Sequence, residues 1–352
     1  MYTTIRVFRQ PLLANFRQRD YNFSEALEMK GKKAADMDKT ESAKIRTGII
    51  ITLIAGILWG FSGTCSQFLF QDYGITPLFL TTIRQTFTGI ILTVIAVLRH
   101  RDRLTAMLKN RRSLVQLVIA GIGGLLFNQL SYMETISYTN SGTATVLQYI
   151  GPVLIMVVSC MMARRLPRRR EILSIILVVV GTFLIATHGN PGSLYITKPG
   201  LIWGLLSAVA LVTYTMLPLP LIREYGAIPT VGCGMLIGGI VMAVTNRFHG
   251  GSATPDARYV LFLFIIVVFG TVLPYTLYLT GVTLCGAVRG SMIACIEPVS
   301  ATVWMVVWLH EPFYAIDFVG FCCILATVFL LARSDQSAKD AASKAGASPS
   351  SL

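Results

Sequence analysis

Apolar blocks of about twenty residues follow one another along most of the chain, separated by short polar connections. A helix of about twenty residues crosses the hydrocarbon core of a bilayer, which is about 30 Å thick. The blocks predict ten membrane-spanning helices at Gly48–Phe70, Thr76–Leu98, Leu114–Ile136, Gly142–Ala163, Glu171–Thr187, Pro199–Ile222, Ala227–Asn246, Arg258–Thr280, Ala287–Leu309 and Phe313–Ala332. We therefore expect an all-α polytopic membrane protein embedded in a lipid bilayer.

Composition agrees with this class. Of the 352 residues, 54% are hydrophobic and 13% are charged, whereas a soluble domain carries about 25% charged residues. The net charge of +13 also suits a nucleic-acid-binding protein. The basic residues, however, lie between the apolar blocks and do not interleave with aromatic residues in one stretch. We expect no nucleic-acid partner.

The distribution of lysine and arginine predicts the orientation in the membrane. These residues are concentrated in the N-terminal tail, between the second and third predicted helices, and between the fourth and fifth, where they are Arg164, Arg165, Arg168, Arg169 and Arg170. Basic loops stay in the cytoplasm. Both termini are therefore expected in the cytoplasm of a multi-pass protein of the cell membrane. The polar tails, 1–46 and 333–352, are predicted to be disordered.

Two parts of the chain resemble each other. The segment 56–60 (GILWG) matches 200–204 (GLIWG) at a shift of 144, and Tyr132 falls on Tyr278 at a shift of 146. The chain is thus predicted to contain two five-helix repeats. Because five is odd, the second repeat enters the membrane from the opposite side, and such inverted repeats can open a central cavity to either side in turn.

The predicted repeats cover 47–187 and 199–332. Both begin with glycines four residues apart, a spacing that lets helix backbones approach closely. These pairs favour helix packing over direct contact with a substrate, and a third pair has the same spacing. The pairs are Gly56/Gly60, Gly200/Gly204 and Gly286/Gly290.

Specific motifs lie in the second repeat. Glu297-Pro298-Val299, then Leu309-His310-Glu311 and a final helix with Gly320, resemble the second half of an EamA domain, and Thr139–Ala186 carries the same pattern. Over residues 48–332 the chain is similar to the ten-helix EamA permeases of the drug/metabolite transporter superfamily. This resemblance implies a basket of ten helices around a central cavity, export of metabolites, amino acids or drugs, and a bacterial plasma membrane.

The chain departs from that family pattern at one place. Arg164-Arg165-Leu166-Pro167 ends the fourth predicted helix where the family usually has a glutamate. Only Glu311 can therefore be assigned to that role, and equal gating by the two halves is not implied.

Placing a charged side chain inside a membrane costs free energy, so charged residues inside predicted helices are the first candidates for a transport pathway. Glu297 can exchange protons or pair with a cationic substrate group, or it can bind backbone groups that Pro298 leaves unpaired. Arg84 can bind a substrate carboxylate, pair with an acidic side chain, or extend toward the membrane surface. Glu134, near the outer end of the third helix, is a further candidate.

Uncharged polar and aromatic residues at membrane depth complete the predicted pathway. Polar groups there face the protein interior, because lipid offers no hydrogen-bond partners, so they either line a cavity or join helices. Aromatic rings can stack on a planar or cationic substrate, although tryptophan also anchors helices at the membrane surface. These residues are Asn128, Tyr132, Gln148, Tyr149, Trp59, Trp203, Tyr214, Tyr275, Tyr278 and Trp304.

Other function classes find less support. A GxSG motif at 60–63 is similar to that of an intramembrane serine protease, but no histidine lies deep in a predicted helix to act as base. The chain has no Walker A motif and no metal-ligand spacing, so we expect no cofactor. The sequence predicts a secondary exporter of a small molecule, with protons as a possible coupling ion. An importer or a facilitator is the alternative, and the substrate and oligomeric state stay open.

Overall fold

The computed structural model describes residues 42–190, 195–246, 255–285, 290 and 293–344. Regular structure in these residues is helical, and eight of the helices are long and apolar enough to cross a membrane. The chain is thus a polytopic membrane protein. The eight helices are Ser42–Tyr73, Pro77–Arg99, Arg111–Tyr138, Ser141–Met162, Arg169–Thr187, Lys198–Tyr225, Ala227–Thr245 and Ala257–Cys285.

Several of these helices are composite. Each is built from shorter helices that follow one another almost without interruption, and two contain a π-helix. The elements are α2 (Pro77–Arg99), α3 (Arg101–Lys109), α4 (Arg111–Ile119), the π-helix η1 (Ala120–Leu126), α5 (Phe127–Tyr138), α6 (Ser141–Gln148), α7 (Gly151–Met162), α8 (Arg169–Thr187), α9 (Lys198–Met216), α10 (Leu219–Tyr225), α11 (Ala227–Asn246), α12 (Ala257–Val267), the π-helix η2 (Val268–Val272), α13 (Leu273–Cys285), α15 (Ile296–Leu309) and α16 (Ala315–Lys344).

The last two predicted spans are not among these eight helices. α15 has 14 residues, and the predicted start of that span at Ala287 lies outside the described residues. α16 covers most of the predicted span Phe313–Ala332. α16 also continues past Ala332 to Lys344, whereas the sequence predicts a disordered tail from residue 333. Extending a formed helix needs no new nucleation, and the alanines of this segment favour it.

Short polar side chains fix where several helices begin. Asn140 and Asp256 each accept a hydrogen bond from the backbone N–H three residues later, both at 2.7 Å. Thr76 caps α2 in the same way at 3.2 Å and is followed by Pro77, whose missing N–H costs nothing at a helix start. These caps let consecutive apolar helices reverse direction over short connections.

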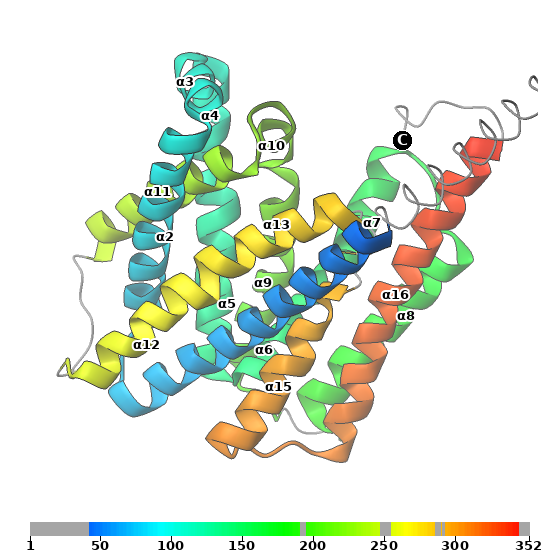
Figure 1. Ribbon diagram of the computed structural model, residues 1–352. Coiled ribbons are helices and arrows are strands. Elements are labelled where there is room, and N and C mark those ends of the chain that lie inside the picture. Colours follow the sequence, from blue (N-terminus) through cyan, green and yellow to red (C-terminus); the bar gives the residue numbers. More distant parts are fainter. Residues whose placement is uncertain (1–41, 191–194, 247–254, 286–289, 291–292, 345–352) are drawn as a thin grey trace, which may run out of the picture.

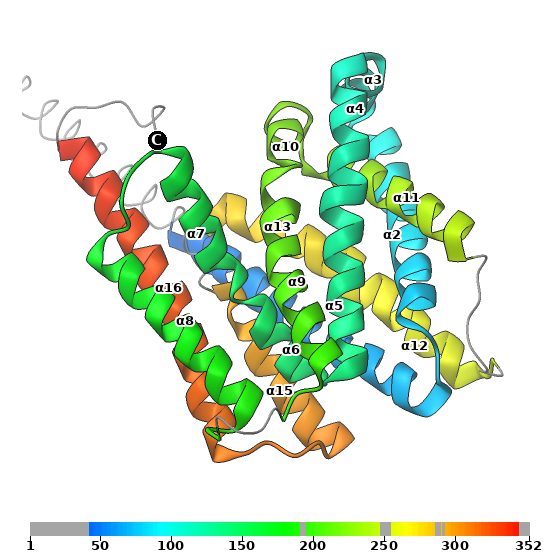
Figure 2. The ribbon, with the colours of Figure 1, turned by 180° about the vertical axis from the view of Figure 1, so that it is seen from behind.

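Glycines allow pairs of helices to pack with their backbones in contact. A Cβ at Gly60 would collide with the backbone of α15, and one at Gly204 would collide with Leu147 of α6. Gly181 of α8 and Gly320 of α16 face each other's backbone, and Figures 1 and 2 show these two helices side by side. The glycine pairs at 56/60 and 200/204 therefore act in packing, as the spacing predicts.

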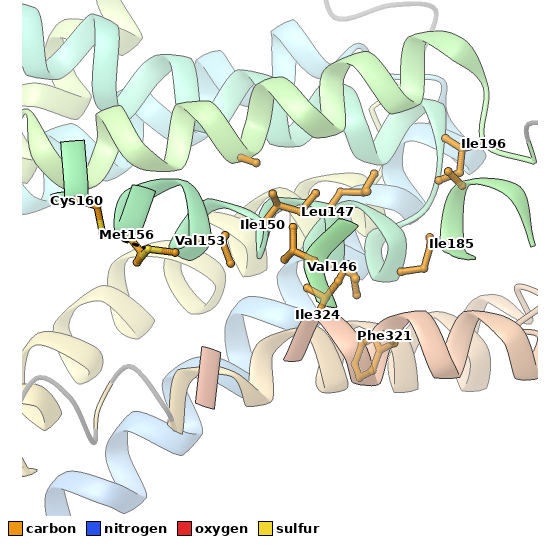
Figure 3. Close-up of a cluster of buried hydrophobic side chains, with 13 residues drawn as sticks. Val146, Leu147, Ile150, Val153, Met156, Cys160, Ile185, Ile196, Phe321 and Ile324 are labelled. Carbon is orange, nitrogen blue, oxygen red and sulfur yellow. Dashed lines mark hydrogen bonds between the residues drawn. The ribbon is translucent and has the colours of Figure 1, made fainter. Parts of the chain in front are cut away.

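A buried apolar cluster joins the fourth and fifth helices to the last one. Figure 3 shows side chains of α6 and α7 meeting those of α8 and α16. Because lipid is as apolar as these side chains, such a cluster holds membrane helices together through close van der Waals packing. The labelled members are Val146, Leu147, Ile150, Val153, Met156, Cys160, Ile185, Ile196, Phe321 and Ile324.

The molecule has two distinct ends. Figures 1 and 2 show α3, α4, α10 and the connection from α7 to α8 at one end, and the connection from α15 to α16 at the other. We call the first the basic end, because it carries the arginines that predict the cytoplasmic side. The second is called the opposite end.

Candidate functional site

Arg84 of α2 is anchored on the π-helix η2. Its Nη2 donates to the carbonyl oxygen of Gly270 at 2.9 Å, and its Nε donates to Oγ1 of Thr271 at 2.7 Å. Thr271 Oγ1 donates in turn to the carbonyl oxygen of Ile266 at 2.9 Å, five residues earlier. The Arg84 side chain is thus bound both to the backbone of η2 and to a hydroxyl that is itself bound to the preceding helical turn.

Gln85 makes the comparable contact with the other π-helix. Its Nε2 donates to the carbonyl oxygen of Leu125, in η1, at 3.0 Å. The two π-helices end at Leu126 and Val272, and these positions are 146 residues apart, the shift found in the sequence. A single helix, α2, therefore binds the wide turn in each half of the chain.

The charge of Arg84 is buried but is not matched by a carboxylate among the described residues. Only 6% of the residue is exposed, and the two ion pairs of the described residues are elsewhere, at Arg165–Glu171 and His188–Asp317. Gln129, with its amide oxygen turned toward Arg84, accepts from Nη1 at 3.1 Å. Neutral oxygen atoms thus hold the guanidinium in place.

A cavity of about 460 Å³ lies beside Arg84. Ten residues that the sequence predicts for the pathway line it, and they come from both halves of the chain. They are Trp59, Arg84, Asn128, Tyr132, Gln148, Tyr149, Tyr214, Tyr275, Tyr278 and Glu297.

Aromatic rings form one wall of this cavity. Trp59 of the N-terminal helix meets Tyr275 edge-to-face, with ring centroids 5.4 Å apart, and Tyr278 at 5.3 Å. The hydroxyl of Tyr214 donates to that of Tyr275 at 3.1 Å. Such a wall offers flat apolar faces with a few fixed hydroxyl groups to a solute.

Glu297 stands in the first turn of α15 and lines the same cavity. The hydroxyl of Tyr149 donates to its Oε2 at 3.4 Å and to the carbonyl oxygen of Ala294 at 3.0 Å. The backbone carbonyl of Glu297 faces Gly60, and the missing side chain of this glycine lets the N-terminal helix approach α15 closely. The cavity thus contains one buried guanidinium and one carboxylate that are not paired with each other.

The cavity reaches the surface at the basic end. Three of its lining residues, Ser159 of α7, Arg165 and Thr215 of α9, are exposed, whereas Arg84 and Gln129 are buried. Arg165 forms the ion pair with Glu171, at 2.8 Å between Nη1 and Oε2. Arg84 therefore lies at the floor of the cavity and Arg165 at its mouth.

Polar contacts close the opposite end. Gln67 and Gln71 of the N-terminal helix both donate to Oε1 of Glu311, at 2.9 and 2.7 Å. Tyr73 donates to Asp256 at 3.0 Å. The hydrogen bonds from the Tyr259 N–H and from the Tyr73 hydroxyl hold the pKa of Asp256 below its usual value. We call these contacts the polar seal.

An aromatic cluster lies beside the polar seal. Phe68 packs between Phe262, at 4.8 Å between centroids, and Trp308, at 5.4 Å. The guanidinium of Arg258 lies over the Phe68 ring at 4.8 Å, which adds a cation–π contact. These rings join the N-terminal helix, α12 and α15 at the end of the molecule away from the cavity mouth.

Three predicted pathway residues do not line the cavity. Glu134 is half-buried near the end of α5. Trp203, the repeat partner of Trp59, is half-buried on α9. Trp304 is 37% exposed and packs against Phe61 with centroids 5.0 Å apart.

Several lining residues do not appear in the sequence-based prediction. Gln129 has the polarity that signals a pathway residue, and its place next to Asn128 is a usable signal. Arg165 is hidden among arginines that set orientation. The apolar and small members have no signal that separates them from helix packing: they are Pro152, Ile155, Met156, Ser159, Leu211, Thr215 and Ala294.

Comparisons with known proteins point to one family. The sequence profile described as the EamA-like transporter family matches residues 46–187 and 198–333. An uncharacterized inner membrane transporter, YicL of Salmonella typhimurium, is 37% identical over 286 residues, which cover 81% of this chain and 95% of the relative. The uncharacterized transporter YetK of Bacillus subtilis is 24% identical over 62% of this chain and 68% of its own.

A solved crystal structure has a similar fold. It matches 82% of this chain and 98% of its own, with a TM-score of 0.57 and 17% sequence identity. At this identity the likeness concerns the arrangement of the helices alone.

Proposed function

Since the chain belongs to the EamA-like transporter family, we propose that it is a secondary transporter that exports small metabolites, amino acids or drug-like solutes. The observation that best supports this proposal is the cavity that residues of both halves line, Arg84 and Glu297 among them. A charge in the centre of a membrane costs several kcal/mol (about 2.5–3.5 on insertion scales), so two of them in one cavity indicate a use.

The lining fits a solute that carries both charges. A carboxylate can approach the guanidinium of Arg84, and an ammonium group can approach Glu297 and the aromatic rings beside it. Trp59, Tyr275 and Tyr278 suit an apolar or aromatic side group. An amino acid with such a side group is our first candidate substrate.

Alternating access by two inverted five-helix repeats is the proposed mechanism. Contacts in one half have counterparts in the other: Gly60 packs on α15 as Gly204 packs on α6, and η1 and η2 end 146 residues apart. Opening the polar seal while closing the mouth would expose the same cavity at the opposite end. The basic end is cytoplasmic in this proposal, so the described conformation receives its solute from the cytoplasm.

The test is transport by the purified full-length protein in liposomes. Labelled L-phenylalanine carries both charges, whereas labelled phenethylamine lacks the carboxylate. We expect saturable counterflow of phenylalanine that exceeds counterflow of phenethylamine at least tenfold. A pH gradient imposed across the liposome membrane tests whether transport is coupled to protons and shows in which direction the gradient drives the solute. If the gradient drives uptake in the importing direction, the result supports the alternative, an importer. If neither compound and no other labelled amino acid shows counterflow, the proposed substrate class is wrong.

A further inference from the structure

Arg165 reaches the central cavity although it follows the end of α7. That helix ends at Met162, and Arg164 adopts a left-handed backbone conformation with φ of 48°. The turn is closed by a hydrogen bond from the Arg165 N–H to the carbonyl oxygen of Cys160 at 3.0 Å. As a result, Arg165 lines the cavity mouth together with Ser159.

The ion pair at the mouth has one fixed and one accessible member. Arg165 Nη1 and Nη2 donate to the two carboxylate oxygens of Glu171 at 2.8 and 2.9 Å. The Glu171 side chain is only 2% exposed and also accepts the N–H of Arg168, whereas the Arg165 side chain is 37% exposed. Because this pair is bidentate and Glu171 is buried, separating it would leave an unpaired buried carboxylate. The exposed part of Arg165 lies at the cavity mouth, where a second anionic group can approach it while Glu171 keeps its place.

The charges along the cavity are ordered. Its charged lining residues are Arg165 at the mouth, and Arg84 and Glu297 deeper inside. The connection from 164 to 170 holds five arginines, and Arg165 alone among them lines the cavity. An approaching solute therefore meets a guanidinium before it meets the carboxylate of Glu297.

We infer that Arg165 is a specificity-determining residue that admits solutes carrying a carboxylate or another anionic group, by presenting the exposed part of its guanidinium to that group at the cavity mouth. The inference rests on the proposed function in one respect, that the cavity is the route of the solute. It adds a first binding step for the anionic group, ahead of Arg84. A guanidinium attracts a carboxylate and can bind it with parallel hydrogen bonds, whereas its charge repels a cation.

The test measures the charge preference of the mouth with small thiol reagents. Ser159→Cys is introduced into the full-length chain, with its seven native cysteines replaced by alanine or serine, and the protein is placed in nanodiscs. Modification rates are measured with the anionic 2-sulfonatoethyl and the cationic 2-(trimethylammonium)ethyl methanethiosulfonates. The ratio of the anionic to the cationic rate is compared among variants. Both rates are measured on the isolated folded fraction, so a lower yield of folded protein does not change the ratio.

We expect Arg165→Gln to lower this ratio about tenfold, because a unit charge a few ångströms from the thiol attracts the anionic reagent and repels the cationic one. Arg165→Lys keeps the charge and should stay within about twofold of the starting protein. Arg169→Gln removes an equal charge from the same connection but outside the cavity, and should also change the ratio less than about twofold. An unchanged ratio in Arg165→Gln, or an equal drop in Arg169→Gln, would overturn the inference. The ratio needs no transported solute, so its outcome is separate from that of the liposome assay.

Discussion

Arg84 and Gln85 are neighbours on α2, yet their side chains bind the π-helices of different halves of the chain, at Gly270 and Leu125. Successive residues of an α-helix point about 100° apart, which lets one helix contact elements on two sides. Any tilt of α2 must therefore strain or break one of these contacts. This arrangement couples the two halves beside the cavity.

The first prediction concerns Gln85. Gln85→Leu removes the donor to the Leu125 carbonyl, and a buried polar group without its partner costs about 1–3 kcal/mol. We expect a lower melting temperature of the detergent-solubilised protein. Val94→Leu, on an exposed part of the same helix, should leave it unchanged. Equal melting temperatures for Gln85→Leu and the parent protein would show that this contact does not stabilise the fold.

The second prediction separates the two repeat-related tryptophans. Trp59→Ala removes the ring that meets Tyr275 and Tyr278 in the cavity, so transport per folded molecule should fall at least tenfold. Trp203→Ala, outside the cavity, should lower folded yield more than specific transport. Counterflow normalised to folded protein measures both. Equal losses of specific transport would contradict a lining role that is confined to Trp59.

The third prediction concerns Glu297. If this carboxylate exchanges protons with the solute pathway, Glu297→Gln keeps the shape but cannot titrate, and solute counterflow should lose its pH dependence. Glu134→Gln, whose parent residue does not line the cavity, is the matched control and should keep the pH profile. An unaltered pH profile in Glu297→Gln would eliminate Glu297 as the proton carrier.

Asp256 is the acid to consider beside Glu297 when a pH profile is interpreted. The pKa of Asp256 in the folded protein lies below the usual value of about 3.9. The contribution of its carboxylate to the stability of the fold is therefore complete above about pH 3.9, and it is lost as the pH falls through the lowered pKa. Between pH 5 and pH 8 its contact with Tyr73 is constant. Asp256→Asn is therefore expected to leave the shape of the transport profile unchanged in that range.

The fourth prediction concerns the polar seal. Glu311→Ala removes the acceptor shared by Gln67 and Gln71, which should favour the conformation open at the opposite end. A cysteine introduced at Asn128, in the cavity, should then react faster with a membrane-impermeant maleimide added from the opposite side. Glu224→Ala, on α10 at the basic end, serves as the control. A rate unchanged by Glu311→Ala would show that these hydrogen bonds do not hold the opposite end closed.

The fifth prediction is topological. Single cysteines at Asn110 and Pro167, in the two basic connections, should react with an impermeant reagent only when the cytoplasmic face is accessible. A cysteine at Ser137, at the opposite end of α5, should react from outside intact cells. External labelling at Pro167 would reverse the assignment of the later helices and remove the inverted-repeat argument.

The sequence predicts the helices well because each needs about twenty apolar residues, a requirement that leaves a clear pattern. Polarity at membrane depth also identifies cavity residues such as Arg84, Asn128 and Glu297, since lipid cannot satisfy them. Repeat matching is a weaker guide to the site. It pairs Trp59 with Trp203, but the two rings are placed differently, because equivalent positions in the two repeats have different neighbours.

Other features have no sequence signal of this kind. The π-helices depend on hydrogen bonds five residues apart and on donors from α2, which hydropathy does not encode. In the sequence, Arg165 is one of several arginines that indicate the cytoplasmic side. Only the turn at Arg164, which the sequence pattern does not show, places it at the cavity. The helical continuation to Lys344 depends on a helix already formed by apolar packing.

The two π-helices also bear on the rotational phase of the residues that follow them. Each residue of an α-helix advances the side-chain direction by about 100°, whereas a π-turn holds one residue more than an α-turn. Deleting one residue within η1 or η2 can therefore be absorbed by a return to α-helical turns. Deleting one residue from the α-helical turn just before Tyr132 or Tyr278 would instead turn that ring by about 100° relative to the preceding helix. Chain length in the third and eighth helices, independently of which apolar residues fill it, thus determines which rings a solute encounters. A natural or engineered deletion in those α-helical turns would change the chemistry of the cavity without replacing any residue that lines it.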